Sequence, residues 1–107
     1  MAAMNINSKK LKEMIENGKT FLVDFWAPWC PHCRKINLAY ELIAEQYAGE
    51  LEVVKVDMDE DDKLWNELQV ELIPTLRLYV NGKPVASTVA PESKAQIETF
   101  IKETLRI

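Results

Sequence analysis

Hydrophobic and polar positions divide the chain into alternating helix-like and strand-like segments. Apolar residues recur every three or four positions in three segments, which predicts amphipathic helices over residues 8–18, 34–48 and 92–106. Nearly unbroken runs of β-branched and aromatic residues predict two buried strands, over residues 20–27 and 51–58. This alternation is typical of a sheet with helices packed on its faces.

The remaining segments predict a hairpin and two short elements. Residues 75–80 and 84–89 are strand-like and flank an Asn-Gly pair, which is typical of a tight β-hairpin turn. A short helix is expected over residues 59–68, because its acidic start suits a helix N-terminus. A short strand is also possible at residues 4–7. A βαβ unit followed by a hairpin and a helix predicts an α/β fold.

Composition and charge narrow the class of protein. The chain has 107 residues, 48% hydrophobic and 28% charged, which suits one globular domain over residues 1–107. The net charge of −4 without a basic patch argues against nucleic-acid binding, and no apolar run could span a membrane. The first residues lack the pattern of an export signal, so we expect a cytoplasmic protein. An exported mature domain whose signal has been removed is the alternative.

The sequence WCPHC contains the only two cysteines of the chain, Cys30 and Cys33. A structural metal site would need a second ligand cluster, and the sole histidine, His32, lies between the cysteines, so no metal is expected. An inert buried pair is a second alternative, although Pro28 and Pro31 indicate a turn near the surface. A redox pair is favoured. At a helix start, the first thiolate would lie against unpaired N–H groups that lower its pKa, with the second thiol one turn away.

Four segments resemble the thioredoxin family: VDFWAPWCPHC (23–33), VVKVDMDE (53–60), IPTLRLYVNGKPV (73–85) and the closing helix. The resemblance covers nearly the whole chain. It implies a thioredoxin fold, with a central mixed sheet flanked by helices on both faces. It also implies dithiol–disulfide exchange with protein clients by a monomer that needs no cofactor and receives electrons from a thioredoxin reductase.

The resemblance gives two charged residues in apolar strands a function. It implies that Asp24 lies beneath the disulfide and moves protons for Cys33, while the ammonium of Lys55 lies beside Asp24. The residues alone also allow a bend or an exposed edge at Asp24 and a surface lysine at Lys55. Burial should raise the pKa of Asp24 and the cation should lower it. Cys30, at the strand end, is expected to be the exposed, attacking thiol and Cys33 the resolving thiol.

The resemblance also implies a groove for client proteins. Pro74 is expected to be cis and to face the cysteines, so that the backbone of Ile73 can pair with an extended client segment. Trp29 would cover the disulfide and contact clients. Ala90 stands where the family has glycine, and its methyl group would narrow the groove.

The chain departs from the family at two further positions. Pro31-His32 replaces the usual Gly-Pro pair and is typical of the bacterial oxidase DsbA, although this chain has no room for the large helical insertion of that enzyme. An imidazolium at His32 would stabilise the thiolate form and make the pair more oxidising. Leu38 stands in place of the family's kinking proline, which predicts a straighter helix.

We therefore expect a thiol–disulfide oxidoreductase that acts chiefly as a reductase of client disulfides. A dithiol oxidase or isomerase is the alternative within the same chemistry. A non-catalytic module that binds clients in the groove between Trp29 and Pro74 is the alternative from another class.

Overall fold

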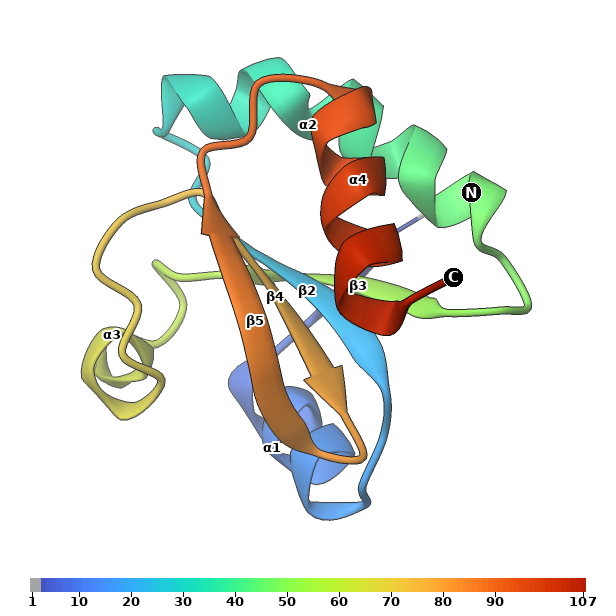
Figure 1. The fold of residues 1–107 in the computed structure, drawn as a ribbon. Coiled ribbons are helices and arrows are strands. Elements are labelled where there is room, and N and C mark those ends of the chain that lie inside the picture. The colour runs from blue at the N-terminus through green and yellow to red at the C-terminus, as the bar shows by residue number, and fades with distance from the viewer. Residues whose placement is uncertain (1–2) are drawn as a thin grey trace.

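The computed structural model describes residues 3–107, which form a five-stranded mixed sheet with helices on both faces (Figure 1). The elements follow in the order β1 (Met4–Ile6), α1 (Ser8–Glu16), β2 (Phe21–Trp26), α2 (Pro31–Gln46), β3 (Glu52–Asp57), α3 (Lys63–Glu67), β4 (Thr75–Val80), β5 (Lys83–Val89) and α4 (Lys94–Leu105). This order confirms the predicted α/β class and the thioredoxin fold.

The sheet places β2 at its centre, in the strand order β1-β3-β2-β4-β5. Strand β3 runs parallel to both β1 and β2, whereas β4 is antiparallel to β2 and β5. Asp24, in the middle of β2, pairs in register with Lys55 on β3 and with Leu76 on β4. Both charged residues therefore lie inside the sheet and not at its edges.

Alternate residues of the central strand point to different helical layers. Phe21 and Val23 pack with residues of α1 and α3, whereas Leu22 packs with residues of α2 and α4. Asp24 follows the same alternation and faces α2. The fully buried Tyr40 of α2 donates its hydroxyl proton to the carbonyl oxygen of Val54 at 2.7 Å, which fixes the helix to the sheet.

The predicted hairpin is confirmed. Asn81 and Gly82 both have positive φ values, 53° and 78°, as a two-residue type I′ turn requires. The strand pairing shifts between Leu78 and Tyr79, and this bulge accommodates Pro84, whose missing N–H group is tolerated at the sheet edge.

The prediction that the second long helix begins at residue 34 is wrong, because α2 begins at Pro31. Cys30 is the N-cap, and proline is favoured in the first helical turn, where its missing N–H costs nothing. The two cysteines therefore flank the first turn of the helix. The helix continues unbroken past Leu38, which is exposed.

The prediction that the acidic residues 59–62 start a helix is also wrong, because α3 begins at Lys63. The side chain of Asp57 accepts a hydrogen bond from the backbone N–H of Asp59, and that of Asp61 accepts one from Lys63. Such local bonds offer the backbone an alternative to the helix, so the acidic segment forms turns.

Candidate active site

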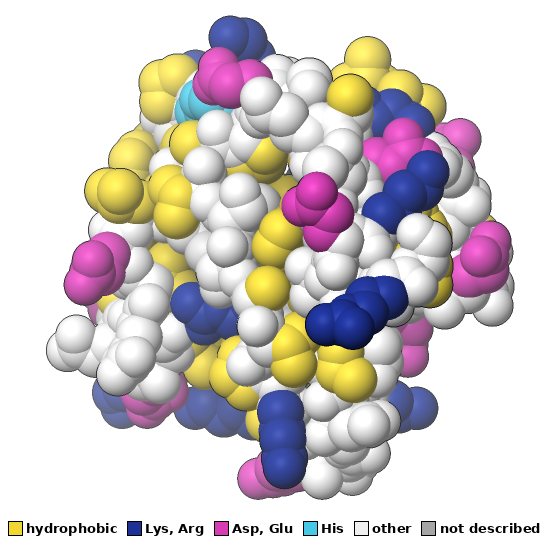
Figure 2. All heavy atoms as spheres, in the orientation of Figure 1, with side chains coloured by type: hydrophobic (Ala, Val, Ile, Leu, Met, Phe, Trp, Pro, Cys, Tyr) yellow, Lys and Arg dark blue, Asp and Glu magenta, His cyan; other side chains and the backbone are white. Residues whose placement is uncertain are grey.

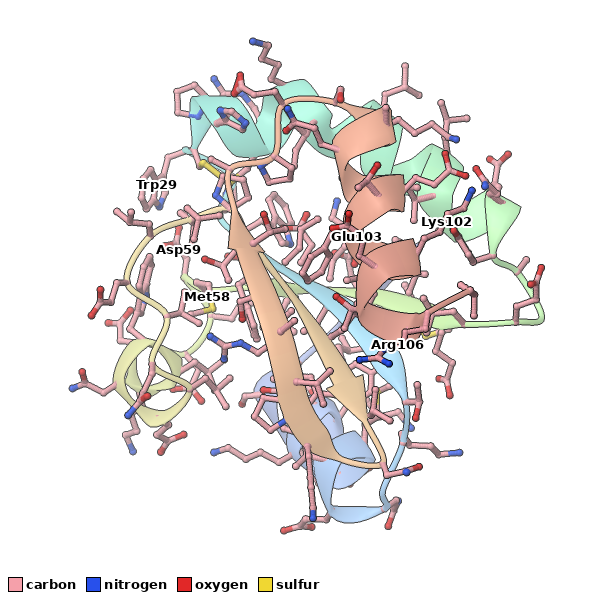
Figure 3. The ribbon with its side chains drawn as sticks, viewed as in Figure 1. Trp29, Met58, Asp59, Lys102, Glu103 and Arg106 are labelled. Carbon is pink, nitrogen blue, oxygen red and sulfur yellow. A yellow bond between two sulfur atoms is a disulfide. The ribbon has the colours of Figure 1, made fainter. Side chains whose placement is uncertain are left out.

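Cys30 and Cys33 form a disulfide where β2 ends and α2 begins (Figure 3). Their Cα atoms are 5.3 Å apart. The backbone N–H of Cys33 donates a hydrogen bond to the Cys30 sulfur at 3.2 Å. This N–H group belongs to the first turn of the helix, where N–H groups otherwise lack a partner. The same bond would favour negative charge on Cys30 after reduction.

The expectation that Cys30 is exposed is wrong for the oxidised protein. Cys30 is 4% exposed and Cys33 3%, so exposure does not distinguish the two sulfurs. Their surroundings do. The Cys30 sulfur lies 3.8 Å from the carbonyl oxygen of Ile73, in the segment that precedes β4, whereas Cys33 lines a partly open cavity together with Asp24.

A cavity extends from the disulfide to the centre of the sheet. It has a volume of about 200 Å³ and is lined by Asp24, Trp26, Cys33, Arg34, Asn37 and Lys55. The indole N–H of Trp26 and one carboxylate oxygen of Asp24 are buried without a hydrogen-bond partner among residues 3–107. The cavity therefore brings one carboxyl group that can take up or release a proton close to Cys33.

Asp24 is 1% exposed, and this burial raises its pKa from 3.8 to about 7. The positive charge of Lys55 opposes the rise, and the negative charge of Glu41 adds to it. A carboxyl group with this pKa exchanges its proton near neutral pH, which is the property required of a general acid or base.

Lys55 is buried, but its ammonium does not form an ion pair with Asp24 among the described residues. The ammonium donates to the side-chain oxygen of Asn37 at 2.6 Å and lies 3.8 Å from a carboxylate oxygen of Glu41. It also lies 4.5 Å from the centre of the Trp26 ring. Lys55 therefore neighbours Asp24 in the sheet while its charge is directed toward α2.

Sequence reasoning missed Asn37 and Glu41. Both follow Cys33 at intervals of four residues, which places all three on one face of α2. This spacing was the signal that could have identified them, since polar side chains on the face shared with a reactive cysteine border the same site.

The residues expected to form the groove come from three segments, which precede α2, precede β4 and follow β5. Trp29 is 59% exposed, and its indole N–H donates to Asp59 at 2.9 Å (Figure 3). The Ile73–Pro74 peptide bond is cis, as the resemblance implied. The carbonyl oxygen of Pro74 accepts a hydrogen bond from the backbone N–H of Ala90 at 2.9 Å. Ala90 has φ of 50°, in the left-handed region that favours glycine.

His32 joins the start of α2 to the segment between β5 and α4. Its Nε2 atom lies 2.9 Å from the carbonyl oxygen of Pro91 and 3.6 Å from a carboxylate oxygen of Glu92. Figure 2 shows the histidine, in cyan, with both acidic and hydrophobic side chains around it at one corner of the molecule. The imidazole is thus held by backbone from a segment far away in the sequence.

Residues 3–107 offer neither a metal site nor a membrane-spanning helix. This part of the chain has no group of three or more His, Cys, Asp or Glu side chains placed to hold a metal ion. None of its helices is long and apolar enough to cross a membrane.

Comparison with known proteins gives one consistent family. The thioredoxin family profile matches residues 2–103. A thioredoxin of Alicyclobacillus acidocaldarius is 32% identical over 105 residues, which cover 98% of this chain and 100% of the relative. Thioredoxin 1 of a Nostoc species is 34% identical over 97% of each chain. A thioredoxin of Acidithiobacillus ferridurans is 39% identical over 87% of this chain and 86% of its own.

Proposed function

The chain belongs to the thioredoxin family and is a thiol–disulfide oxidoreductase acting on disulfide-bearing substrates as a reductase, and we propose that Cys30 attacks and Cys33 resolves. One observation carries this assignment. The Cys33 N–H donates to the Cys30 sulfur, whereas Cys33 itself borders the cavity of Asp24. The first sulfur is thus placed to exist as a thiolate, and the second is placed to lose a proton to a nearby base.

The reaction transfers two electrons from the protein dithiol to a client disulfide. The Cys30 thiolate attacks one client sulfur, the client S–S bond breaks, and the other client sulfur leaves as a thiolate. Asp24 then takes the proton of the Cys33 thiol across the cavity. The Cys33 thiolate attacks the Cys30 sulfur, which releases the second client thiolate and forms the Cys30–Cys33 disulfide.

Client proteins are proposed to bind in the groove formed by Trp29, Ile73, Pro74 and Ala90. The carbonyl oxygen of Ile73 lies beside the Cys30 sulfur and can accept a hydrogen bond from an extended client segment, in the manner of an added strand. The exposed indole of Trp29 supplies apolar contact area on the same side.

His32 and Pro31 are proposed to set the reduction potential. A positive charge on the imidazole would stabilise the Cys30 thiolate over the neutral disulfide and raise the potential. A single partly solvated charge is worth about 0.3–2 kcal/mol, whereas the gap between thioredoxin and DsbA is about 150 mV, or roughly 7 kcal/mol. His32 therefore moves the potential only part of the way toward that of the oxidase.

The domain organisation, electron donor, oligomeric state and cellular location of the protein are also proposals. One domain over residues 1–107 is supported by a family match that reaches from residue 2 to residue 103. A reductase must be re-reduced after each turnover, so we propose a thioredoxin reductase as the electron donor. We also propose a monomer that works in the cytoplasm, where thiols are kept reduced.

The Pro31-His32 pair favours a second candidate function, a dithiol oxidase that donates its disulfide to clients. Reduction of insulin in the presence of dithiothreitol separates an enzyme from a non-catalytic binding module, and the reduction potential separates the reductase from the oxidase. We expect the wild type to accelerate reduction, and both Cys30→Ser and Cys33→Ser to abolish turnover. A non-catalytic binding module would give the same slow rate for all three proteins.

A further inference from the structure

Three partners hold the ammonium of Lys55 on the helix side of the cavity. Asn37 accepts a hydrogen bond from it at 2.6 Å, Glu41 lies 3.8 Å away, and the ring of Trp26 lies beneath it at 4.5 Å. Glu41 is itself anchored, because its other carboxylate oxygen accepts a hydrogen bond from the backbone N–H of Ala3 at 2.9 Å. The position of the charge is therefore determined by several contacts.

Asp24, in contrast, has a buried oxygen without a partner in the described part of the chain, although it is the cross-strand neighbour of Lys55. Two carboxylates, those of Asp24 and Glu41, thus compete for one ammonium, and the geometry favours Glu41. The other titratable or charged groups that face Asp24 come from α2 and are Cys33, Arg34 and Tyr40. Its neighbour on β4 is the apolar Leu76.

We propose that Asn37 and Glu41 are positioning residues of the exchange reaction, which hold the Lys55 ammonium away from Asp24 and so keep Asp24 able to take the proton of Cys33. The proposal rests on the function proposed above, in which Asp24 is the base for Cys33. Neither residue touches the reacting sulfurs. Their effect passes through the position of one charge.

The physical reason is the effect of a nearby cation on a carboxyl group. A positive charge within hydrogen-bond distance stabilises the carboxylate and makes it a weaker base, since the pKa falls. Glu41 opposes this effect twice, because it attracts Lys55 and adds its own negative charge to the surroundings of Asp24. Loss of Glu41 should therefore lower the pKa of Asp24, and an additional carboxylate at Asn37 should raise it.

The direct test is an NMR titration of the Asp24 carboxyl carbon in the oxidised protein. We expect Glu41→Gln to lower the titration midpoint by roughly 1 pH unit, Asn37→Ala to lower it by less, and Asn37→Asp to raise it. Glu45→Gln is the matched control, because Glu45 is an exposed carboxylate one turn further along the same helix. If Asn37 only maintained the fold, Asn37→Ala and Asn37→Asp would not shift the Asp24 midpoint in opposite directions.

The pH profile of client-disulfide reduction gives the second readout. Its acid limb should move to lower pH in Glu41→Gln, return to the wild-type position in Glu41→Asp, and stay unchanged in Glu45→Gln. In an Asp24→Asn background, Glu41→Gln should have no further effect on this limb.

The two proposals fail in different ways. An Asp24 midpoint that is the same in wild type and Glu41→Gln overturns the positioning role, even if Asp24→Asn removes the acid limb. A pH profile that Asp24→Asn leaves unchanged overturns the role of Asp24 as base, and the positioning role in the reaction with it, whatever the titration shows.

Discussion

Cys33 and Asp24 line one cavity, although one residue belongs to the first turn of α2 and the other to the middle of β2. Exposure does not distinguish the two cysteines, since both are buried in the oxidised protein. The cavity places the carboxyl group of Asp24 near Cys33, whereas the Cys30 sulfur lies beside the carbonyl oxygen of Ile73, in the groove proposed for clients.

The first prediction concerns the order of the two sulfurs. Cys33→Ser should accumulate mixed disulfides between Cys30 and client proteins, because the resolving thiol is missing. Cys30→Ser should form none, since the thiol of Cys33 faces the interior. Non-reducing gels and mass spectrometry of the trapped species check this result. Efficient trapping by Cys30→Ser would reverse the assignment of attacking and resolving sulfur.

The second prediction concerns the stability of the protein at different pH values. The pKa of Asp24 is about 7 in the folded protein against 3.8 for an unperturbed carboxyl group. The folded state therefore binds the proton more tightly, and stability is lost as the pH rises from about 4 to about 7. Asp24→Asn should remove this loss and raise the free energy of unfolding above pH 7 by up to about 4 kcal/mol, at ~1.4 kcal/mol per pH unit.

Urea unfolding of wild type and Asp24→Asn at about pH 4 and about pH 8 measures the difference. The free energy of unfolding of Asp24→Asn should exceed that of the wild type by more at about pH 8 than at about pH 4. A difference that is independent of pH would show that the buried carboxyl group is not the cause.

The third prediction concerns Ala90, whose φ of 50° is unfavourable for a residue with a Cβ atom. Ala90→Gly should raise the free energy of unfolding by roughly 0.5–1 kcal/mol and lower the KM for bulky client peptides, because a methyl group at the groove is lost. Ala86→Gly, in the extended conformation of β5, is the control and should destabilise the protein by a similar amount. Equal destabilisation by both changes would contradict the backbone explanation.

The fourth prediction concerns the direction of the reaction. Equilibration with glutathione should give the wild type a reduction potential between about −270 mV and about −120 mV, the values of thioredoxin and DsbA. The double change Pro31→Gly and His32→Pro should move it toward the reducing end. An unchanged potential would mean that His32 only joins α2 to Pro91, and a wild-type value near that of DsbA would favour the oxidase.

The elements and their order could be predicted from the sequence because each has a strong local signal. The apolar run of β2 and the Asn-Gly turn depend on neighbouring residues alone, and both appear in the structure. The boundaries of α2 and α3 could not be predicted as well. Pro31 starts α2, and the side chains of Asp57 and Asp61 accept hydrogen bonds from N–H groups two residues later. Both effects act at element ends, where competing local bonds are close in energy.

The candidate site was only partly predictable for a different reason. The cysteines are identified by their CxxC motif, and Asp24 is identified by its unusual position in an apolar strand. The contacts of Lys55 with Asn37 and Glu41, and of His32 with Pro91, join segments that are distant in the sequence. Their existence depends on how α2 packs on the sheet and beside α4, which no local pattern specifies.

Quenched-flow analysis of the reduced protein reacting with a disulfide-containing peptide, with mass spectrometry at each time point, tests the roles of Cys30, Cys33 and Asp24 together. We expect a transient peptide adduct on Cys30 that decays as Cys33 attacks. In Asp24→Asn, the adduct should form at the same rate and decay about 100-fold more slowly, with the difference greatest near neutral pH. An adduct on Cys33 would reverse the roles of the two sulfurs, and decay at the same rate in both proteins would exclude Asp24 as the base for Cys33.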